Sequence, residues 1–247
     1  MYKTLHGLVL REVKYKESSK ILTILTEEEG KITAEARGAL RKGSKCSAAS
    51  QVLTWSELTF FENRGRYTLT EGSVLEDFAA LRADLGDYAL GCYMAELLEA
   101  VSDEDSHSTA LLHLGLNALF ALSRQLYPAK HIKAVFELRA MCLSGYEPDL
   151  RGCAVCGAPE PDRFNISQGV LQCAACRAEG EDDIRLPMSA GTRAALRYLD
   201  SAPPSRVFSF RLAEPSLSEL GQITESYLCT RLERGFSTLD FYKSLFL

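Results

Sequence analysis

Two pairs of closely spaced cysteines constrain this chain more than any other feature of its sequence. Sixteen residues separate the two C-x2-C pairs, which are Cys153/Cys156 and Cys173/Cys176. Each pair lets two thiolates approach one ion from a tight turn, and the spacer can fold back as a short hairpin to close a tetrahedral S4 site. Gly157 and Gly169 stand where the turns are needed. The spacing therefore predicts a zinc module over residues 150–178.

Four thiolates would fill the coordination of one Zn²⁺ and leave no position for a substrate water, so the predicted ion is structural. The alternative is a set of disulfides or free thiols. The start of the chain has no apolar signal segment, which predicts a cytoplasmic protein in a reducing compartment and favours metal ligation. No apolar run approaches the roughly 20 residues that span a bilayer. Of the isolated cysteines, Cys92 and Cys142 lie in apolar helical patterns and are expected in the core.

Residues 1–75 have the pattern of short β-strands. Segments rich in β-branched and aromatic residues alternate with turn signals, at 5–13, 19–26, 30–38, 52–62 and 66–75. Within them Ile32, Ala34 and Ala36 recur with the period of two of a half-buried strand. Five short strands suit a small closed barrel, of which the OB-fold is the commonest nucleic-acid-binding example. An SH3-like barrel fits the alternation as well.

From about residue 80 the apolar spacing becomes helical. Helices are predicted over 87–102, 109–126 and 130–144, before the cysteine segment. After it, Ser189 is expected to cap a helix that reaches residue 200, and Ser216 to Glu219 has the form of a capping box that opens a last long helix. The predicted fold class is α+β, with an OB-fold barrel over 1–80 and a helical domain over 81–247 that contains the zinc module.

Positive charge gathers in the predicted barrel although the whole chain has a net charge of −5. Residues 1–76 carry 12 Lys and Arg against 10 Asp and Glu, and the remainder carries 16 against 23. The candidate DNA-binding residues lie on two segments, Arg37, Arg41, Lys42 and Lys45 after the third strand, and Arg11, Lys14, Lys16 and Lys20 around the first hairpin. The Ser/Lys-rich stretch 42–50 is predicted to be a flexible loop. Cations on barrel loops with an aromatic nearby, here Tyr15, can follow a phosphate backbone while bases stack.

No motif for catalysis is intact in the sequence. The segment from Gly38 to Lys45 resembles a phosphate-binding loop, but it reads Gly-Ser-Lys where the motif requires Gly-Lys-Ser/Thr. The acidic runs Glu27–Glu29 and Glu181–Asp183 stand in turn-like contexts, which favours solvated loops over a two-metal nuclease site. The sequence therefore predicts a protein that is not an enzyme.

Several short motifs together resemble the RecO family of bacterial recombination mediators over essentially the full length of the chain. They are Gly7–Arg11, Ser19–Leu22, Ile32–Leu40, Phe136–Arg139, Gly145–Leu150 and Lys243–Leu247. The most specific part is Phe136–Arg139 together with the run from Gly145 to Leu150, Gly-Tyr-Glu-Pro-Asp-Leu, which leads directly into the first cysteine pair.

The resemblance implies an N-terminal OB-fold, a helical domain and an embedded zinc module. It also implies binding to single- and double-stranded DNA, annealing of complementary strands, and work with RecR. In the family these activities assist the loading of RecA onto DNA coated by single-stranded DNA-binding protein, in the cytoplasm and at the nucleoid. By analogy the loop of Arg37, Arg41, Lys42 and Lys45 is the place for DNA. The alternative hypotheses are an RNA-binding protein built from a barrel and a zinc knuckle, and a nucleotide-dependent enzyme.

Overall fold

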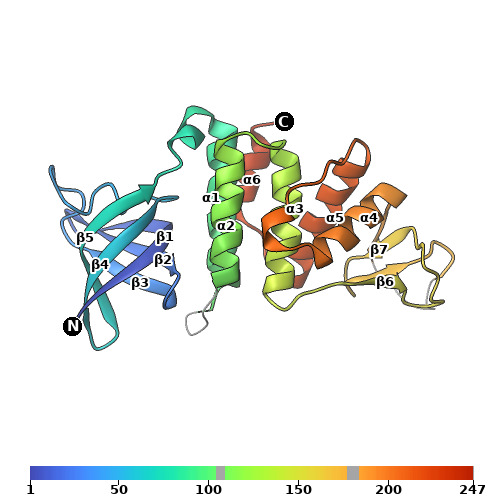
Figure 1. The fold of residues 1–247 in the computed structure, drawn as a ribbon, viewed down its shortest axis with the longest axis horizontal. Coiled ribbons are helices and arrows are strands. Elements are labelled where there is room, and N and C mark those ends of the chain that lie inside the picture. The colour runs from blue at the N-terminus through green and yellow to red at the C-terminus, as the bar shows by residue number, and fades with distance from the viewer. Residues whose placement is uncertain (104–108, 177–183, 247) are drawn as a thin grey trace. The chain divides into compact units, whose positions relative to one another are not determined.

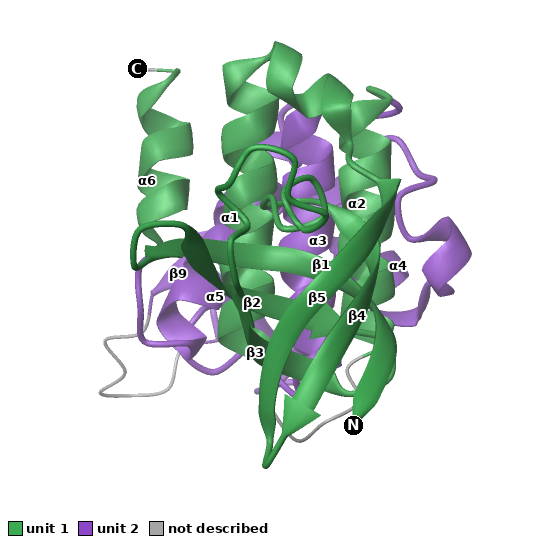
Figure 2. Cartoon of the chain, turned by 90° about the vertical axis from the view of Figure 1, so that its left-hand side faces the viewer, with its two compact units in different colours: residues 1–125, 236–247 green, residues 126–235 purple. Residues whose placement is uncertain are grey.

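The computed structural model describes residues 1–103, 109–176 and 184–246 of the chain. These form two compact units (Figure 2), which we call the barrel unit, residues 1–125 and 236–247, and the cysteine unit, residues 126–235. The predicted acidic loop Glu181–Asp183 and the last two residues of the predicted zinc module lie outside the described residues. No helix among the described residues is long and apolar enough to cross a membrane.

Five strands of the barrel unit close into a barrel in the order β1-β2-β3-β5-β4 (Figure 1). They are β1 (Tyr2–Tyr15), β2 (Ser19–Thr26), β3 (Gly30–Ala36), β4 (Trp55–Asn63) and β5 (Arg66–Glu76). The β3–β5 pair is parallel and short, whereas every other neighbouring pair is antiparallel. This strand order confirms the predicted OB-fold over the SH3-like alternative.

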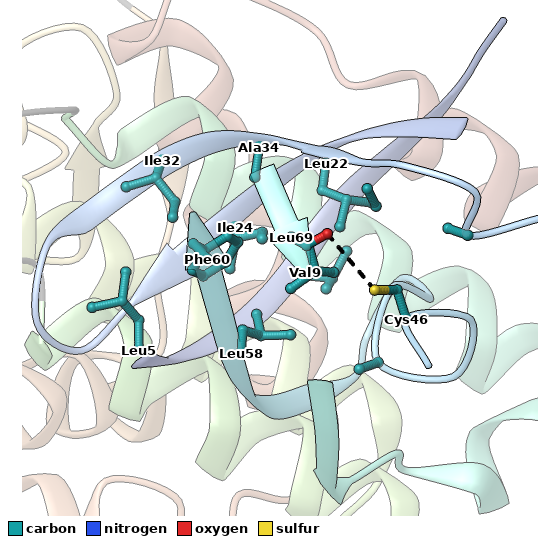
Figure 3. Close-up of a cluster of buried hydrophobic side chains, with 13 residues drawn as sticks. Leu5, Val9, Leu22, Ile24, Ile32, Ala34, Cys46, Leu58, Phe60 and Leu69 are labelled. Atoms are coloured by element: carbon teal, nitrogen blue, oxygen red, sulfur yellow. Dashed lines mark hydrogen bonds between the residues drawn. The ribbon is translucent and has the colours of Figure 1, made fainter. Parts of the chain in front are cut away.

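The barrel core follows from the period of two in its strands (Figure 3). Ile32, Ala34 and Ala36 are buried along β3, while the residues between them face outward, as predicted. The loop after β3 also contributes to the core, because Cys46 is only 3% exposed and donates a hydrogen bond to the Leu69 carbonyl. The stretch 42–50, predicted to be a flexible loop, is therefore anchored at its centre by an apolar contact.

Helices complete the barrel unit. They are η1 (Ala79–Ala83), α1 (Leu85–Val101), α2 (Thr109–Ser123) and α6 (Ser237–Ser244). Asp84 caps α1 by accepting a hydrogen bond from the Asp87 backbone N–H, and α1 packs against β1, α2 and α6. The sequence reading missed α6, which has eight residues and buries only Leu239 and Tyr242. Two buried residues do not establish a helical period.

The cysteine unit contains α3 (Ala129–Leu143), α4 (Ala190–Ser201), η2 (Pro204–Arg206) and α5 (Ser216–Arg231). A buried charge network joins α3 to α5. Lys133 Nζ lies 2.7 Å from a carboxylate oxygen of Glu137 and 2.8 Å from one of Glu225, and the Thr224 hydroxyl donates to Glu137. Every charge in the network has an opposite partner, which is the condition under which burial of charge is tolerated.

The predicted capping box at the start of α5 is wrong. The N-cap is Pro215, and it makes no side-chain capping bond. The Glu219 carboxylate instead accepts hydrogen bonds from the Ser189 backbone N–H and the Thr192 hydroxyl, at the start of α4. Burial would raise the pKa of Glu219, but these hydrogen bonds outweigh it and lower the pKa. Ser189 does cap α4, as predicted, by accepting from the Thr192 N–H.

Candidate metal centre and nucleic-acid interface

A small sheet positions the two cysteine pairs in the cysteine unit. Its strands run in the order β6-β8-β7-β9 and are β6 (Asp149–Cys153), β7 (Arg163–Asn165), β8 (Val170–Gln172) and β9 (Arg185–Pro187). Cys153 ends β6, and Cys173 follows the end of β8. Because β6 and β8 are parallel neighbours, both pairs arrive at the same edge of the sheet. Segments twenty residues apart in the chain are thereby brought to one point.

The four cysteine sulfurs lie within 4.8 Å of one another and could hold a metal ion. The Sγ atoms of Cys156 and Cys173 are 3.8 Å apart. A tetrahedral site with Zn–S bonds of about 2.3 Å has sulfur–sulfur edges of about 3.8 Å, so this separation fits an S4 centre. The residues that the C-x2-C spacing singled out are brought together, and their donor chemistry suits a soft-to-borderline cation.

Backbone N–H groups favour ionisation of one of these sulfurs, that of Cys153, and not of Cys173 or Cys176. Burial alone would raise the pKa of Cys153, but hydrogen bonds from the backbone of Cys156, Val155 and Cys173 outweigh it and lower the pKa to about 6. Burial and the neighbouring sulfurs raise the pKa of Cys173 to about 12. Hydrogen bonding to Cys156, with burial, raises the pKa of Cys176 to about 11. Cys173 and Cys176 therefore resist ionising beside Cys153 unless a cation offsets the charge.

Glycine and tyrosine anchor the module to the helices. As predicted, Gly157 and Gly169 adopt positive φ angles, of 73° and 68°. A Cβ on Gly169 would lie 2.8 Å from the Tyr227 hydroxyl oxygen, so a larger residue there would displace the buried Tyr227 side chain of α5. The Asp162 carboxylate accepts a 2.7 Å hydrogen bond from the Ala174 N–H and so orders the second cysteine pair.

Three hydrogen bonds join the two cationic segments that were predicted in the barrel. In the loop after β3, the Leu40 N–H donates to the Ser18 carbonyl over 3.0 Å, and Arg41 Nε donates to the Ser18 hydroxyl over 3.3 Å. The Gly38 N–H donates to the Ser19 hydroxyl over 3.3 Å. This brings the loop against the β1–β2 turn. The exposed cations of the two segments other than Arg11, whose partner lies on α1, are called the basic rim, and they are Lys14, Lys16, Arg37, Arg41, Lys42 and Lys45.

Most of the basic rim is open to a polyanion. Lys14 and Lys42 have no ion pair among the residues that the structure describes. Arg37 pairs with Glu35 at 3.1 Å, and Lys45 lies 3.6 Å from Glu71. Exposed pairs of this kind contribute roughly 0–1 kcal/mol, so phosphate can replace the carboxylate at little cost. Lys16 Nζ lies 4.8 Å from the ring centre of Tyr15, which places a cation and an aromatic together as predicted.

Two of the predicted DNA-binding residues are engaged elsewhere. Lys20 is 8% exposed, and its ammonium contacts a Glu12 carboxylate oxygen at 2.7 Å and the Ser50 carbonyl at 3.4 Å. Arg11 is exposed but pairs with Glu99 of α1 at 3.0 Å. The loop that buries Cys46 also covers Lys20, and this packing is not visible in the sequence. Lys20 is therefore closed to DNA, whereas the exposed pair of Arg11 resembles that of Arg37 and its role in DNA binding stays a prediction.

The sequence reading missed a second cationic site on the barrel unit. Beside the short β3–β5 seam lies a groove of about 600 Å³, and the residues of interest along it are Arg37, Phe61, Arg66 and Tyr67. Residues 63–65 were predicted only as the turn signal between two strands. The sequence signal that could have indicated this groove is an outward aromatic of β4, Phe61, followed by Arg64 and Arg66 at the turn.

Comparison with known proteins identifies relatives over nearly the whole chain. The family described as recombination protein O N terminal matches residues 1–78, and recombination protein O C terminal matches residues 82–240. DNA repair protein RecO of Acetivibrio thermocellus is 34% identical over 97% of this chain and 95% of its own length. The protein of the same name from Symbiobacterium thermophilum is 30% identical over 97% of this chain and 96% of its own length. The one from Anaeromyxobacter dehalogenans is 37% identical over 96% of this chain and 94% of its own length.

Proposed function

Because the chain belongs to the RecO family of DNA repair and recombination proteins, we propose that it is a recombination mediator that works by binding rather than by catalysis. It binds single- and double-stranded DNA and anneals complementary strands. With RecR it assists the loading of RecA onto DNA coated by single-stranded DNA-binding protein. It acts in the cytoplasm, at the nucleoid.

The observation that supports this proposal most directly is the joining of the two cationic segments. Hydrogen bonds from Leu40 and Arg41 to Ser18 hold the loop after β3 against the β1–β2 turn. A surface that binds phosphates releases condensed counterions, and this release supplies affinity that does not depend on sequence. Annealing requires two polyanions to approach each other, and cations held on one surface lower that repulsion without any chemistry.

We further propose that the four cysteines hold one structural Zn²⁺. The ion neutralises thiolates that resist ionising together, and it links strands too short to be stable alone. The sulfur spacing and the backbone N–H groups directed at Cys153 support this assignment. With four protein ligands the ion has no open position, so the centre shapes the helical domain and takes no part in a reaction.

We also propose that the two predicted domains, residues 1–80 and residues 81–247, bind different partners. The first carries the DNA contacts, and the second carries the contacts with partner proteins. The charge supports this assignment, because residues 77–247 carry 16 Lys and Arg against 23 Asp and Glu. An acidic surface repels DNA but can bind a protein partner of opposite charge.

An annealing time course tests the proposed function. Complementary DNA strands are mixed with the full chain without ATP, in the presence and absence of purified single-stranded DNA-binding protein. We expect annealing in both cases and a rate that falls steeply with salt. A strict requirement for ATP, or no annealing at low salt, would contradict the proposal. Competition between single-stranded DNA and structured RNA at one salt concentration decides between this function and the RNA-binding alternative.

A further inference from the structure

A groove on the outer face of the barrel unit adjoins the basic rim. β3 and β5 pair only from Ala34 to Ala36 and from Tyr67 to Leu69, and the groove of about 600 Å³ runs beside this short parallel seam. Side chains of four strands or their flanking residues line it, among them Ile21, Glu35, Arg37, Phe61, Arg66 and Tyr67. Arg37 belongs both to this groove and to the basic rim, so the two surfaces are continuous.

An exposed aromatic pair borders the groove. Phe61 of β4 is 41% exposed although it lies in a strand, and its ring meets the edge of Tyr2, which is 68% exposed. The two residues face each other across the β1–β4 ladder, and their ring centres are 5.4 Å apart at an angle of 62°. Single exposed aromatics are common, but in a contacting pair next to a groove each ring fixes the orientation of the other, so the exposed ring face has a defined direction.

The charges around this pair favour an anionic ligand. Arg66 is exposed and makes no ion pair among the residues that the structure describes. Each nearby carboxylate has a cationic partner: Lys3 Nζ lies 2.7 Å from Glu29 and 3.3 Å from Glu62. Glu35, which lines the groove, pairs with Arg37 at 3.1 Å, and phosphate can replace the carboxylate in such an exposed pair at little cost. The Tyr67 hydroxyl also donates to Glu29. The groove thus combines the exposed ring of Phe61 with the guanidinium of Arg66, which makes no ion pair with a carboxylate among the described residues.

We propose that this groove binds unpaired bases of single-stranded DNA, with one base stacked on Phe61 and the flanking phosphates held by Arg66 and Arg37. The inference rests on the proposed function and adds a preference for single strands. A base in a duplex is already stacked on both faces and cannot reach a protein ring, whereas an unpaired base can. The basic rim binds phosphates of either form, and the groove distinguishes them.

Replacement of Phe61 by alanine tests this site, with Phe120→Ala as the matched control. Phe120 is 46% exposed, lies on α2 of the same unit and is not part of the groove. Affinities are measured by fluorescence anisotropy, at one salt concentration, for a thymidine oligonucleotide, an abasic strand of equal length and a duplex. The first two ligands carry the same phosphates and differ only in their bases.

We expect the unchanged protein to bind the thymidine strand more tightly than the abasic strand. Stacking contributes about 1–3 kcal/mol per base, so Phe61→Ala lowers affinity for the thymidine strand by about 5- to 150-fold. Affinity for the abasic strand and the duplex stays the same, and so does the salt slope. Phe120→Ala changes none of these quantities, and Phe61→Trp restores the affinity lost in Phe61→Ala. Arg66→Gln weakens both single strands and lowers the salt slope by roughly 0.7.

Equal affinity of the unchanged protein for the thymidine and abasic strands overturns the inference but leaves the proposed function standing. An equal loss for strand and duplex in Phe61→Ala, not restored by tryptophan, also overturns it, because that result indicates a damaged barrel. Failure of the unchanged protein to bind any of the three ligands contradicts the proposed function as well.

Discussion

The barrel and the cysteine module of this chain are ordered by different physical means. The barrel has strands of seven to fourteen residues around an apolar core in which Leu22, Ile24 and Phe60 are fully buried. The module has strands of three to five residues, and four sulfurs stand at its centre. Burial can hold the barrel by itself, so its surface is free to bind a ligand. In the proposed zinc centre all four thiolates are metal ligands that stabilise the fold.

The largest effect should follow from loss of one sulfur. Cys153→Ser is expected to release the metal and to lower the free energy of unfolding of the cysteine unit by several kcal/mol, because folding is coupled to the ion. The barrel unit should keep its stability. Elemental analysis gives the metal content, and hydrogen exchange resolves the two units. Cys92→Ala, outside the module, is the control and should retain about one zinc per chain. Equal metal content in both variants would contradict a structural zinc at these cysteines.

Charge reversal in the loop should affect binding without affecting folding. Arg41, Lys42 and Lys45 changed together to glutamate should weaken binding to all DNA sequences about equally. Each phosphate contact that is removed lowers the salt slope for single strands by roughly 0.7. A triple reversal of Lys130, Arg206 and Arg211, exposed in the cysteine unit, gives the same change in net charge and serves as the control. If both triple variants lose the same affinity, only net charge matters and the basic rim is not a site.

Within the barrel, Lys20 and Lys42 should separate an effect on stability from an effect on DNA binding. Its ammonium is held by Glu12 and Ser50, so Lys20→Met should leave DNA affinity unchanged within about twofold. The free energy of unfolding should fall by about 1–3 kcal/mol, because a buried charged hydrogen bond is lost. Lys42→Met should do the reverse, with weaker binding and unchanged stability. Chemical denaturation and anisotropy on both variants measure the two quantities, and a Lys20→Met variant that loses more affinity than Lys42→Met contradicts the assignment.

The smallest effect should be an opposite response of the two units to pH. The hydrogen bond to Glu28 outweighs burial and raises the pKa of His6 above 6.5. Its contribution to barrel stability is therefore full below pH 6.5 and is lost as pH rises through the folded pKa. Burial lowers the pKa of His131 below 6.5, although the Phe208 carbonyl partly opposes it. That contribution to the cysteine unit is full above pH 6.5 and is lost as pH falls.

Hydrogen exchange in each unit over a pH series measures this response. His6→Ala should flatten the profile of the barrel unit alone, and His131→Ala that of the cysteine unit alone. Parallel profiles in the two units would show that these histidines do not determine the pH dependence.

The sequence predicted those parts of the fold that depend on local periodicity. Alternation along β3 and the cap at Ser189 are found as predicted. The capping box failed because Glu219 is hydrogen-bonded to residues of another helix, which a four-residue pattern cannot reveal. Helix α6 was missed because its burial pattern is too short to set a period.

The candidate sites divide in the same way. The cysteine cluster was predictable, because the spacing of its ligands along the chain is itself the signal. The surface of the barrel was only partly predictable. Whether Lys20 faces water depends on how the loop after β3 packs over it. An outward residue such as Phe61 can be recognised as part of a groove only when the neighbouring strands are placed in space.

The proposed function requires the loop after β3 and the β1–β2 turn to form one surface for DNA. The most direct measurement is the salt dependence of single-strand affinity for four proteins, which are the unchanged chain, Lys14/Lys16→Glu, Arg41/Lys42→Glu and the combination. Because each double variant removes two cations that bind phosphates, the slope should fall by roughly 1.4 in each and by roughly 2.8 in the combination. The annealing rate should fall in the same order. A slope that is unchanged in the combined variant would contradict the claim.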